Sequence, residues 1–295
     1  MNTKNGNKRG LSAAAAGTIS LGGELTVNRL GFGAMRITGD GIWGPPKNRA
    51  GAIAVLRRAV ELGVNFIDTA DSYGPNVSEE LIAEALSPYP KGLVIATKGG
   101  WNRPGPNQWT HDATPAHLRK AVEGSLKRLR LDRIDVYQLH VPDPVVPLAA
   151  SIETLANMQS EGKIRLVALS NVTVEHIERA RTIVPIVSVQ NRYSFGDREW
   201  DNVVEYCEHN GIAFIPWFPL GAGTVAAKAL DHIAKERKVK PIQVALAWLL
   251  KRSPVMLPIP GTSSITHLEE NVQAASLQLT DDEYLQLNQV VALAS

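Results

Sequence analysis

The chain has 295 residues, of which 44% are hydrophobic, so it can bury a large core as one α/β barrel or as two domains. Its 31 basic and 29 acidic residues leave a net charge of +2 without a long run of either sign, which argues against a nucleic-acid or polyanion binder. The lone Cys207 excludes a disulfide framework and a cysteine metal cluster, and no apolar run approaches the ~20 residues of a membrane helix.

The N-terminal segment has the outline of a weak signal peptide. KRGLSAAAAGTISLGG has a basic start and small residues, but it is too mildly apolar for the hydrophobic region of a signal sequence. We therefore expect residues 1–17 to be a flexible leader, residues 18–295 to be the folded domain, and the protein to be cytoplasmic rather than exported.

The body of the chain alternates apolar strand candidates with amphipathic helices. A helix over 49–63 has Leu56 on its apolar face, and Thr114 with Pro115 opens another. Further helices are predicted at 174–183, 241–252 and 264–275. Eight segments contain predicted strands: 28–34, 64–68, 93–98, 134–140, 160–170, 187–191, 209–217 and 255–260.

Eight alternating units in ~270 residues, with no linker between them, are typical of a (β/α)₈ barrel. A doubly wound open sheet is the alternative architecture. The glycines of GFGAMR (31–36) resemble a dinucleotide-binding fingerprint only weakly, because no amphipathic helix follows them directly.

Polar side chains stand at the ends of the predicted strands, where the catalytic groups of a barrel lie. Each could also be structural: a paired lysine, a core histidine, a packed aromatic or a helix cap. Four proton-handling residue types at three consecutive strand ends nevertheless favour a catalytic site. These four are Asp68, Tyr73, Lys98 and His140, and later strands end in Ser170, Asn171, Gln190 and Trp217.

Together, these four residue types could polarise a carbonyl group and transfer a proton to it. A phenol with an ordinary pKa of ~10 is a poor acid at pH 7, and a neighbouring ammonium is expected to lower the pKa of Tyr73. Lys98 needs a counter-charge, for which Asp68 is available, and His140 can orient a carbonyl group. Such a site lacks a hydride source, so a nicotinamide cofactor is expected.

From about residue 24 to the end, the chain resembles the aldo-keto reductase superfamily. The motifs that carry the resemblance are LGFGAM, FIDTADSYG, ATKGG, DVYQLHVPD, LSNVT, VQNRYS, PWFPLG and IPGTSSITHLEEN. The resemblance implies a single α/β (β/α)₈ TIM barrel whose bottom is capped by an N-terminal β-hairpin. It assigns Tyr73 as general acid/base, tuned by Lys98 and Asp68, with His140 orienting the substrate.

The resemblance also implies a site for NADPH and a small aldehyde or ketone substrate. Cofactor contacts are expected from Gly33, Ala34, Met35, Asp68, Ser170, Asn171, Gln190, Trp217, Phe218, Pro219, Leu220, Gly221, Gly261, Thr262, Ser263, His267, Glu270 and Asn271. Substrate contacts are expected from Met35, Trp43, Tyr73, Trp101 and His140, and no metal is expected.

Two features depart from the family pattern. The Lys and Arg that often face the NADPH 2′-phosphate are replaced by Gly261 and His267, so NADH remains an alternative cofactor. The connections also look short, which predicts an open pocket.

The combination of LSNVT, PWFPLG and IPGTSS resembles bacterial general reductases and pyridoxal reductases, and a monomer or small homo-oligomer is expected. Two other functions compete: a cofactor-bound regulatory subunit resembling potassium-channel β-subunits, and a metal-dependent barrel hydrolase. The complete four-residue set favours the reductase over the regulatory subunit, and the lack of a His-rich ligand set argues against the hydrolase.

Overall fold

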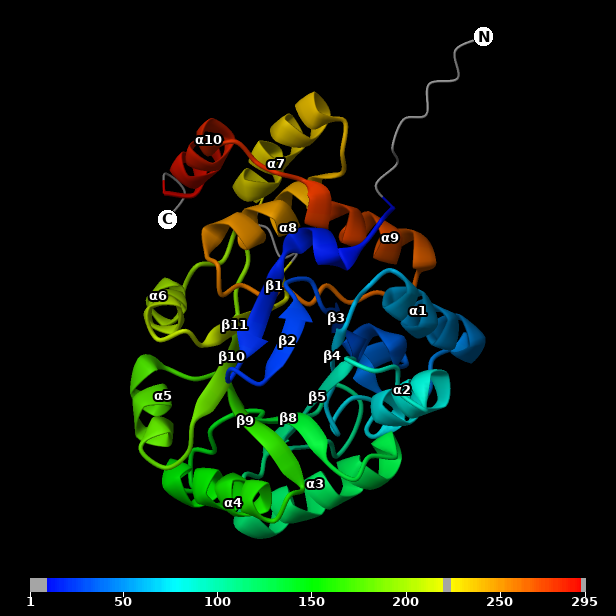
Figure 1. Ribbon diagram of the computed structural model, residues 1–295, viewed down its shortest axis with the longest axis vertical. Coiled ribbons are helices and arrows are strands. Elements are labelled where there is room, and N and C mark those ends of the chain that lie inside the picture. Colours follow the sequence, from blue (N-terminus) through cyan, green and yellow to red (C-terminus); the bar gives the residue numbers. More distant parts are fainter. Residues whose placement is uncertain (1–9, 220–223, 293–295) are drawn as a thin grey trace.

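The computed structural model describes residues 10–219 and 224–292. In these residues a seven-stranded parallel sheet, ordered β11-β10-β9-β8-β5-β4-β3, curls into a barrel surrounded by helices (Figure 1). The strands are β1 (Thr18–Leu21), β2 (Leu25–Asn28), β3 (Phe32–Gly33), β4 (Phe66–Asp68), β5 (Val94–Gly99), β6 (Trp101–Asn102), β7 (Thr110–His111), β8 (Ile134–Leu139), β9 (Ile164–Ser170), β10 (Ile186–Arg192) and β11 (Ala213–Trp217). The helices are α1 (Arg49–Glu61), α2 (Val77–Leu86), α3 (Pro115–Leu129), α4 (Leu148–Ser160), α5 (Val174–Arg181), α6 (Asp201–His209), α7 (Thr224–Arg237), α8 (Pro241–Arg252), α9 (Ile265–Gln273) and α10 (Asp281–Ala292).

The segment 255–260 differs from the strand predicted there. Two of its six residues are prolines, which have no N–H to donate to a ladder. It nevertheless closes the barrel: Leu257 N donates to Phe214 O of β11 (2.9 Å), and Gly31 N, just before β3, donates to Pro258 O (3.0 Å). The barrel prediction is therefore confirmed, and the open sheet is wrong.

The β1–β2 hairpin lies across one end of the barrel (Figure 1). Leu21 and Val27 of the hairpin are fully buried in one apolar cluster with Val94, Leu166 and Val187, which stand near the starts of their strands. Burying these side chains stabilises the closed end of the barrel. The hairpin thus covers the amino-terminal end of the strands, as expected, and leaves the carboxyl-terminal end open for a site.

The expected leader is partly ordered. Ala13–Ala16 form a 3-10 helix whose first turn is capped by the Ser12 hydroxyl. Ala13 is fully buried, and its N–H donates to Leu62 O at 2.8 Å. The prediction of a flexible leader is therefore wrong over residues 12–16, because the Ser12 cap, the burial of Ala13 and the hydrogen bond to Leu62 at the end of α1 fix this short helix. Residues 1–9 lie outside the described part of the chain.

Several helix predictions match closely. The predicted helix 241–252 is α8, and α3 begins where Thr114 and Pro115 indicated, with the Thr114 hydroxyl accepting from His117 N. Among the described residues, the helices include none with both the length and the apolar character needed to cross a membrane.

Candidate active site

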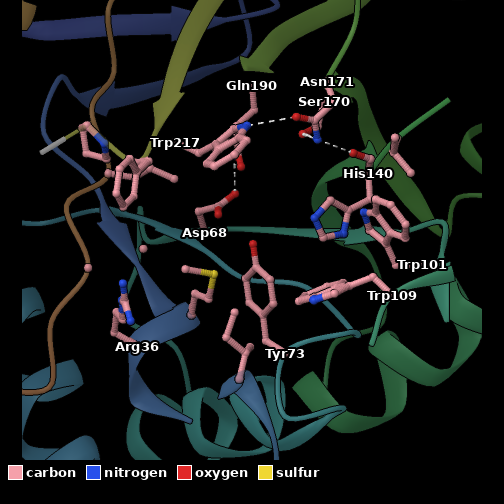
Figure 2. A pocket seen from close by; sticks show the side chains of 18 of the residues that line it. Arg36, Asp68, Tyr73, Trp101, Trp109, His140, Ser170, Asn171, Gln190 and Trp217 are labelled. Carbon is pink, nitrogen blue, oxygen red and sulfur yellow. Dashed lines mark hydrogen bonds between the residues drawn. The ribbon is translucent and has the colours of Figure 1, made fainter. Parts of the chain in front are cut away.

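The four predicted catalytic residues come together at the carboxyl end of the barrel. Asp68 is the last residue of β4, Lys98 lies near the end of the adjacent β5, and His140 follows β8, which pairs with β5. Tyr73 lies in the loop after β4. Because parallel strands end at one rim, side chains from separate motifs face one another there (Figure 2).

Lys98 and Asp68 form a buried ion pair. Lys98 Nζ is fully inaccessible and donates to Asp68 Oδ2 at 2.7 Å and to Thr69 O at 2.9 Å. Burial alone lowers the pKa of Lys98, but the carboxylate of Asp68 and the phenol of Tyr73 outweigh it, and the net pKa lies above the usual lysine value. Lys98 is therefore a fixed positive charge, held by the counter-ion predicted for it.

Tyr73 is within reach of that charge. Its hydroxyl lies 3.5 Å from Lys98 Nζ, and its ring is 5.1 Å from the same nitrogen. The expected lowering of the pKa of Tyr73 is wrong for this structure: burial raises its pKa, and the ammonium of Lys98 offsets only part of that effect. The phenol consequently holds its proton at neutral pH, as a general acid must before it acts.

His140 lies beside Tyr73, with ring centroids 5.9 Å apart in an edge-to-face arrangement. Burial, together with the charge of Lys98, lowers the pKa of His140 well below its usual value. Its Nδ1 is 3.5 Å from Ser72 Oγ. The imidazole is therefore neutral, and one ring nitrogen is held by the loop that carries Tyr73.

Two glutamines hold the second oxygen of Asp68. Gln138 Nε2 and Gln190 Nε2 each donate to Asp68 Oδ1 at 2.8 Å. Gln138 was not predicted, although the period of two along β8 places it on the same face as His140. These bonds fix the carboxylate rotamer and, with it, the position of Lys98.

A cavity of about 690 Å³ opens above these residues. Residues of all the predicted groups line it: Gly33, Met35, Asp68, Tyr73, Trp101, His140, Ser170, Asn171, Gln190, Trp217, Phe218, Pro219 and Gly261. Unpredicted residues also line it, namely Arg36, Ile42, Trp109, His111, Val141 and Ile259. Lys98 lies beneath the floor, Ala34 and Trp43 are not among the lining residues, and Leu220 and Gly221 lie outside the described residues.

One wall of the cavity is cross-linked by hydrogen bonds. Trp217 Nε1 donates to Asn171 Oδ1 at 3.0 Å, and Asn171 Nδ2 donates to His140 O at 3.0 Å and to Ser170 Oγ at 3.1 Å (Figure 2). The alternative that Ser170 and Asn171 cap α5 is wrong, because Thr173 caps it. The indole of Trp217 is thus held in a fixed orientation at the cavity.

A second hollow of about 890 Å³ adjoins the first and shares Met35, Arg36, Ile42 and Gly261 with it. The predicted cofactor residues Thr262 and Ser263 line this second hollow. His267, Glu270 and Asn271, all on α9, line neither hollow. Asn271 is nonetheless buried, and its Oδ1 has no hydrogen-bond partner in the part of the chain that the structure describes.

Aromatic rings of a small hairpin form the outer wall. Strands β6 and β7 pair antiparallel and bring Trp101, Trp109 and His111 to the cavity. Only Trp101 was predicted to lie there. The available signal was the pair of tryptophans flanking the turn-forming RPGPNQ (103–108), just after the strand that ends near Lys98.

The sequence profile of the Aldo/keto reductase family matches residues 29–292. The chain belongs to this family. An uncharacterised oxidoreductase of Schizosaccharomyces pombe is 52% identical over 281 residues, which are 95% of this chain and 91% of that protein. Pyridoxine 4-dehydrogenase of Escherichia coli is 46% identical over 275 residues, covering 91% and 96% of the two chains.

The fold of this aldo/keto reductase is shared with solved structures. An aldo/keto reductase from Klebsiella pneumoniae, crystallised with NADP and acetate, superposes with a TM-score of 0.79 at 26% identity and covers 93% of this chain and 95% of its own. Membership of the family identifies the protein as an oxidoreductase.

Proposed function

We propose that this aldo/keto reductase reduces small aldehydes or ketones with NADPH, using Tyr73 as the general acid. The observation that carries the proposal is the cluster of Tyr73, Lys98, Asp68 and His140 at one cavity floor, with Lys98 Nζ 3.5 Å from the Tyr73 hydroxyl and 2.7 Å from Asp68. A protonated phenol beside a permanent ammonium can give up its proton when negative charge develops nearby.

The residues around the two hollows fit a nicotinamide dinucleotide. Trp217 is a fixed aromatic face for a flat ring, and the hydroxyl and amide of Ser170 and Asn171 stand at its edge. The Klebsiella pneumoniae relative crystallised with NADP supports this choice of cofactor.

Arg36 supplies a positive charge near the proposed cofactor site, and it was not predicted from the sequence. It is exposed at the junction of the two hollows, beside Gly261, and no salt bridge to it occurs among the described residues. A free guanidinium there favours a ligand with phosphate groups. NADPH is therefore the first cofactor to test and NADH the second.

The protein's own residues account for proton transfer and orientation. When bound, the nicotinamide supplies the hydride. His140 is neutral and, with Nδ1 beside Ser72, presents its other ring nitrogen to the carbonyl oxygen. Tyr73 protonates the oxygen as the alcohol forms, and Lys98 stabilises the resulting phenolate at 3.5 Å.

Pyridoxal is one candidate substrate. The 46% identity to pyridoxine 4-dehydrogenase extends over 91% of this chain and supports testing pyridoxal reduction and pyridoxine oxidation together.

Initial rates with NADPH and NADH, across aldehydes, ketones and pyridoxal, test the proposal. Tyr73→Phe is expected to lower kcat by roughly 10²–10⁴-fold. Tyr206→Phe on α6 is the matched control and should keep the full rate, because the Tyr206 hydroxyl accepts a hydrogen bond from the surface residue Arg181, away from the cavity. Full activity of Tyr73→Phe would disprove the mechanism. Tight cofactor binding without any turnover would indicate a regulatory subunit instead.

A further inference from the structure

The side chain of Arg103 connects the turn of the β6–β7 hairpin to the loops around the site by hydrogen bonds. Arg103 Nε donates to Gln108 O at 2.9 Å, which closes the hairpin on itself. Its Nη1 donates to Ser72 O at 2.8 Å, and its Nη2 donates to Gly41 O at 3.2 Å. One guanidinium therefore joins three separate segments of the chain.

The same guanidinium lies against two indole rings. Its Cζ is 3.7 Å from the centroid of Trp109 and 5.6 Å from that of Trp43. Such cation–π contacts are directional and hold the ring where the cation is fixed. Trp43 does not line the cavity, but its ring contacts Arg103 and its backbone pairs with Gly74, the residue after Tyr73.

Arg103 forms no salt bridge in the described part of the chain, although it is partly buried. Carbonyl oxygens and ring faces are its only partners there. A guanidinium already engaged in this way has little capacity left for an anionic ligand. Its position therefore suits it to holding other residues in place, for which the planar five-donor fork is well adapted.

The residues that Arg103 holds border the reacting groups. Ser72 precedes Tyr73, and its hydroxyl lies 3.5 Å from His140 Nδ1. Trp109 and Trp101 stand edge-on to His140, with centroids 6.5 Å and 6.3 Å away (Figure 2). A flat ring attached to a carbonyl at His140 would therefore meet indole faces and edges.

We propose that Arg103 is a positioning residue that fixes Trp109 against the mouth of the cavity and thereby selects flat aromatic carbonyl compounds over aliphatic ones. The proposal rests on the proposed reductase function. Aromatic rings gain from ordered aromatic walls through offset and edge-to-face contacts, whereas a short alkyl chain gains little.

The test compares benzaldehyde with propanal in the full-length protein. Arg103→Met keeps the aliphatic stem and removes every donor, and Arg103→Lys keeps the charge without the fork. Both variants should lower kcat/KM for benzaldehyde roughly tenfold more than they lower kcat/KM for propanal. The control is Arg179→Lys, which should match the wild type, because Arg179 is exposed on α5 and pairs with Glu175 of the same helix.

A second readout does not depend on turnover. Quenching of tryptophan fluorescence by benzamide, which the site cannot reduce, should report a weaker Kd in both Arg103 variants. An unchanged benzaldehyde-to-propanal preference, an unchanged benzamide Kd, or no benzamide binding by the wild type would each overturn the proposal. If the wild type reduces no aldehyde with either cofactor, the reductase proposal fails, and the benzamide titration still decides the role of Arg103.

Discussion

Lys98 Nζ and Asp68 Oδ2 are 2.7 Å apart in a place that water does not reach, with side-chain exposures of 0% and 3%. Removing one partner of such a pair leaves an uncompensated buried charge, which costs about 3–5 kcal/mol. The pair is therefore both a structural element and the source of the positive charge beside Tyr73.

Lys98→Met should destabilise the protein by about 3–5 kcal/mol and abolish most activity, since Asp68 then stays buried without its counter-ion. The double variant Lys98→Met, Asp68→Asn should recover most of the free energy of unfolding but no activity. Urea titration and initial rates measure the two effects. A single variant as stable as the wild type would contradict the role given to the pair.

His140 predicts an asymmetric pH response. Its pKa is held well below its usual value by burial and by Lys98, so it stays neutral as the pH falls through 6.5. The unfolded chain takes up that proton near pH 6.5, so the free energy of unfolding falls as the pH drops below this value. His140→Gln should flatten this slope, while the exposed His209→Gln should keep it. In the wild type, the pH profile of kcat should show no inflection near 6.5.

The contribution of Asp71 to the free energy of unfolding should change with pH in the opposite direction to that of His140. Burial, with a contribution from nearby Glu79, raises its pKa to about 8. Between about pH 4 and 8 the folded carboxyl therefore holds a proton that the unfolded chain has lost, so this group lowers stability as the pH rises. Asp71→Asn mimics the protonated acid and should be more stable than the wild type at pH 8, by a few kcal/mol at most, and equal at pH 4.

Thermal unfolding at pH 4, 6 and 8 measures the effect of Asp71→Asn. The exposed Asp132→Asn is the control and should follow the wild type at all three values. A gain in stability that does not grow with pH would show that the carboxyl of Asp71 is ionised in the folded protein.

Gly33 and Gly261 lie so close together that a side chain on Gly261 would clash with the backbone of Gly33. A Cβ on Gly261 would lie 2.4 Å from Gly33 O, a backbone atom that cannot rotate away. Gly261→Ala should therefore cost about 1–3 kcal/mol and weaken cofactor binding. Gly10→Ala should change neither, because no atom of the described residues lies within 4 Å of the added Cβ. Calorimetry and a cofactor titration check both variants.

The sequence predicted the barrel well because local patterns carry much of the needed information. Helix 241–252 and the start of α3 at Thr114 follow from periodicity and capping, which depend on nearby residues alone. The prediction of a strand at 255–260 was wrong, because its two prolines have no N–H to donate to the hydrogen-bond ladder of the sheet. Whether such a segment still closes the barrel depends on Phe214 and Gly31, which are distant in the chain.

The order of residues by itself determined which groups reach the open rim, because each of Asp68, Lys98 and His140 ends or follows an apolar strand, and parallel strands end together. Only the tertiary structure decided how those groups are tuned. Burial outweighs the effect of Lys98 on the pKa of Tyr73, and the Arg103 guanidinium reaches Ser72 and Gly41, 31 and 62 residues away in the chain. Desolvation and long-range contacts depend on the whole surrounding volume, which no local pattern of residues encodes.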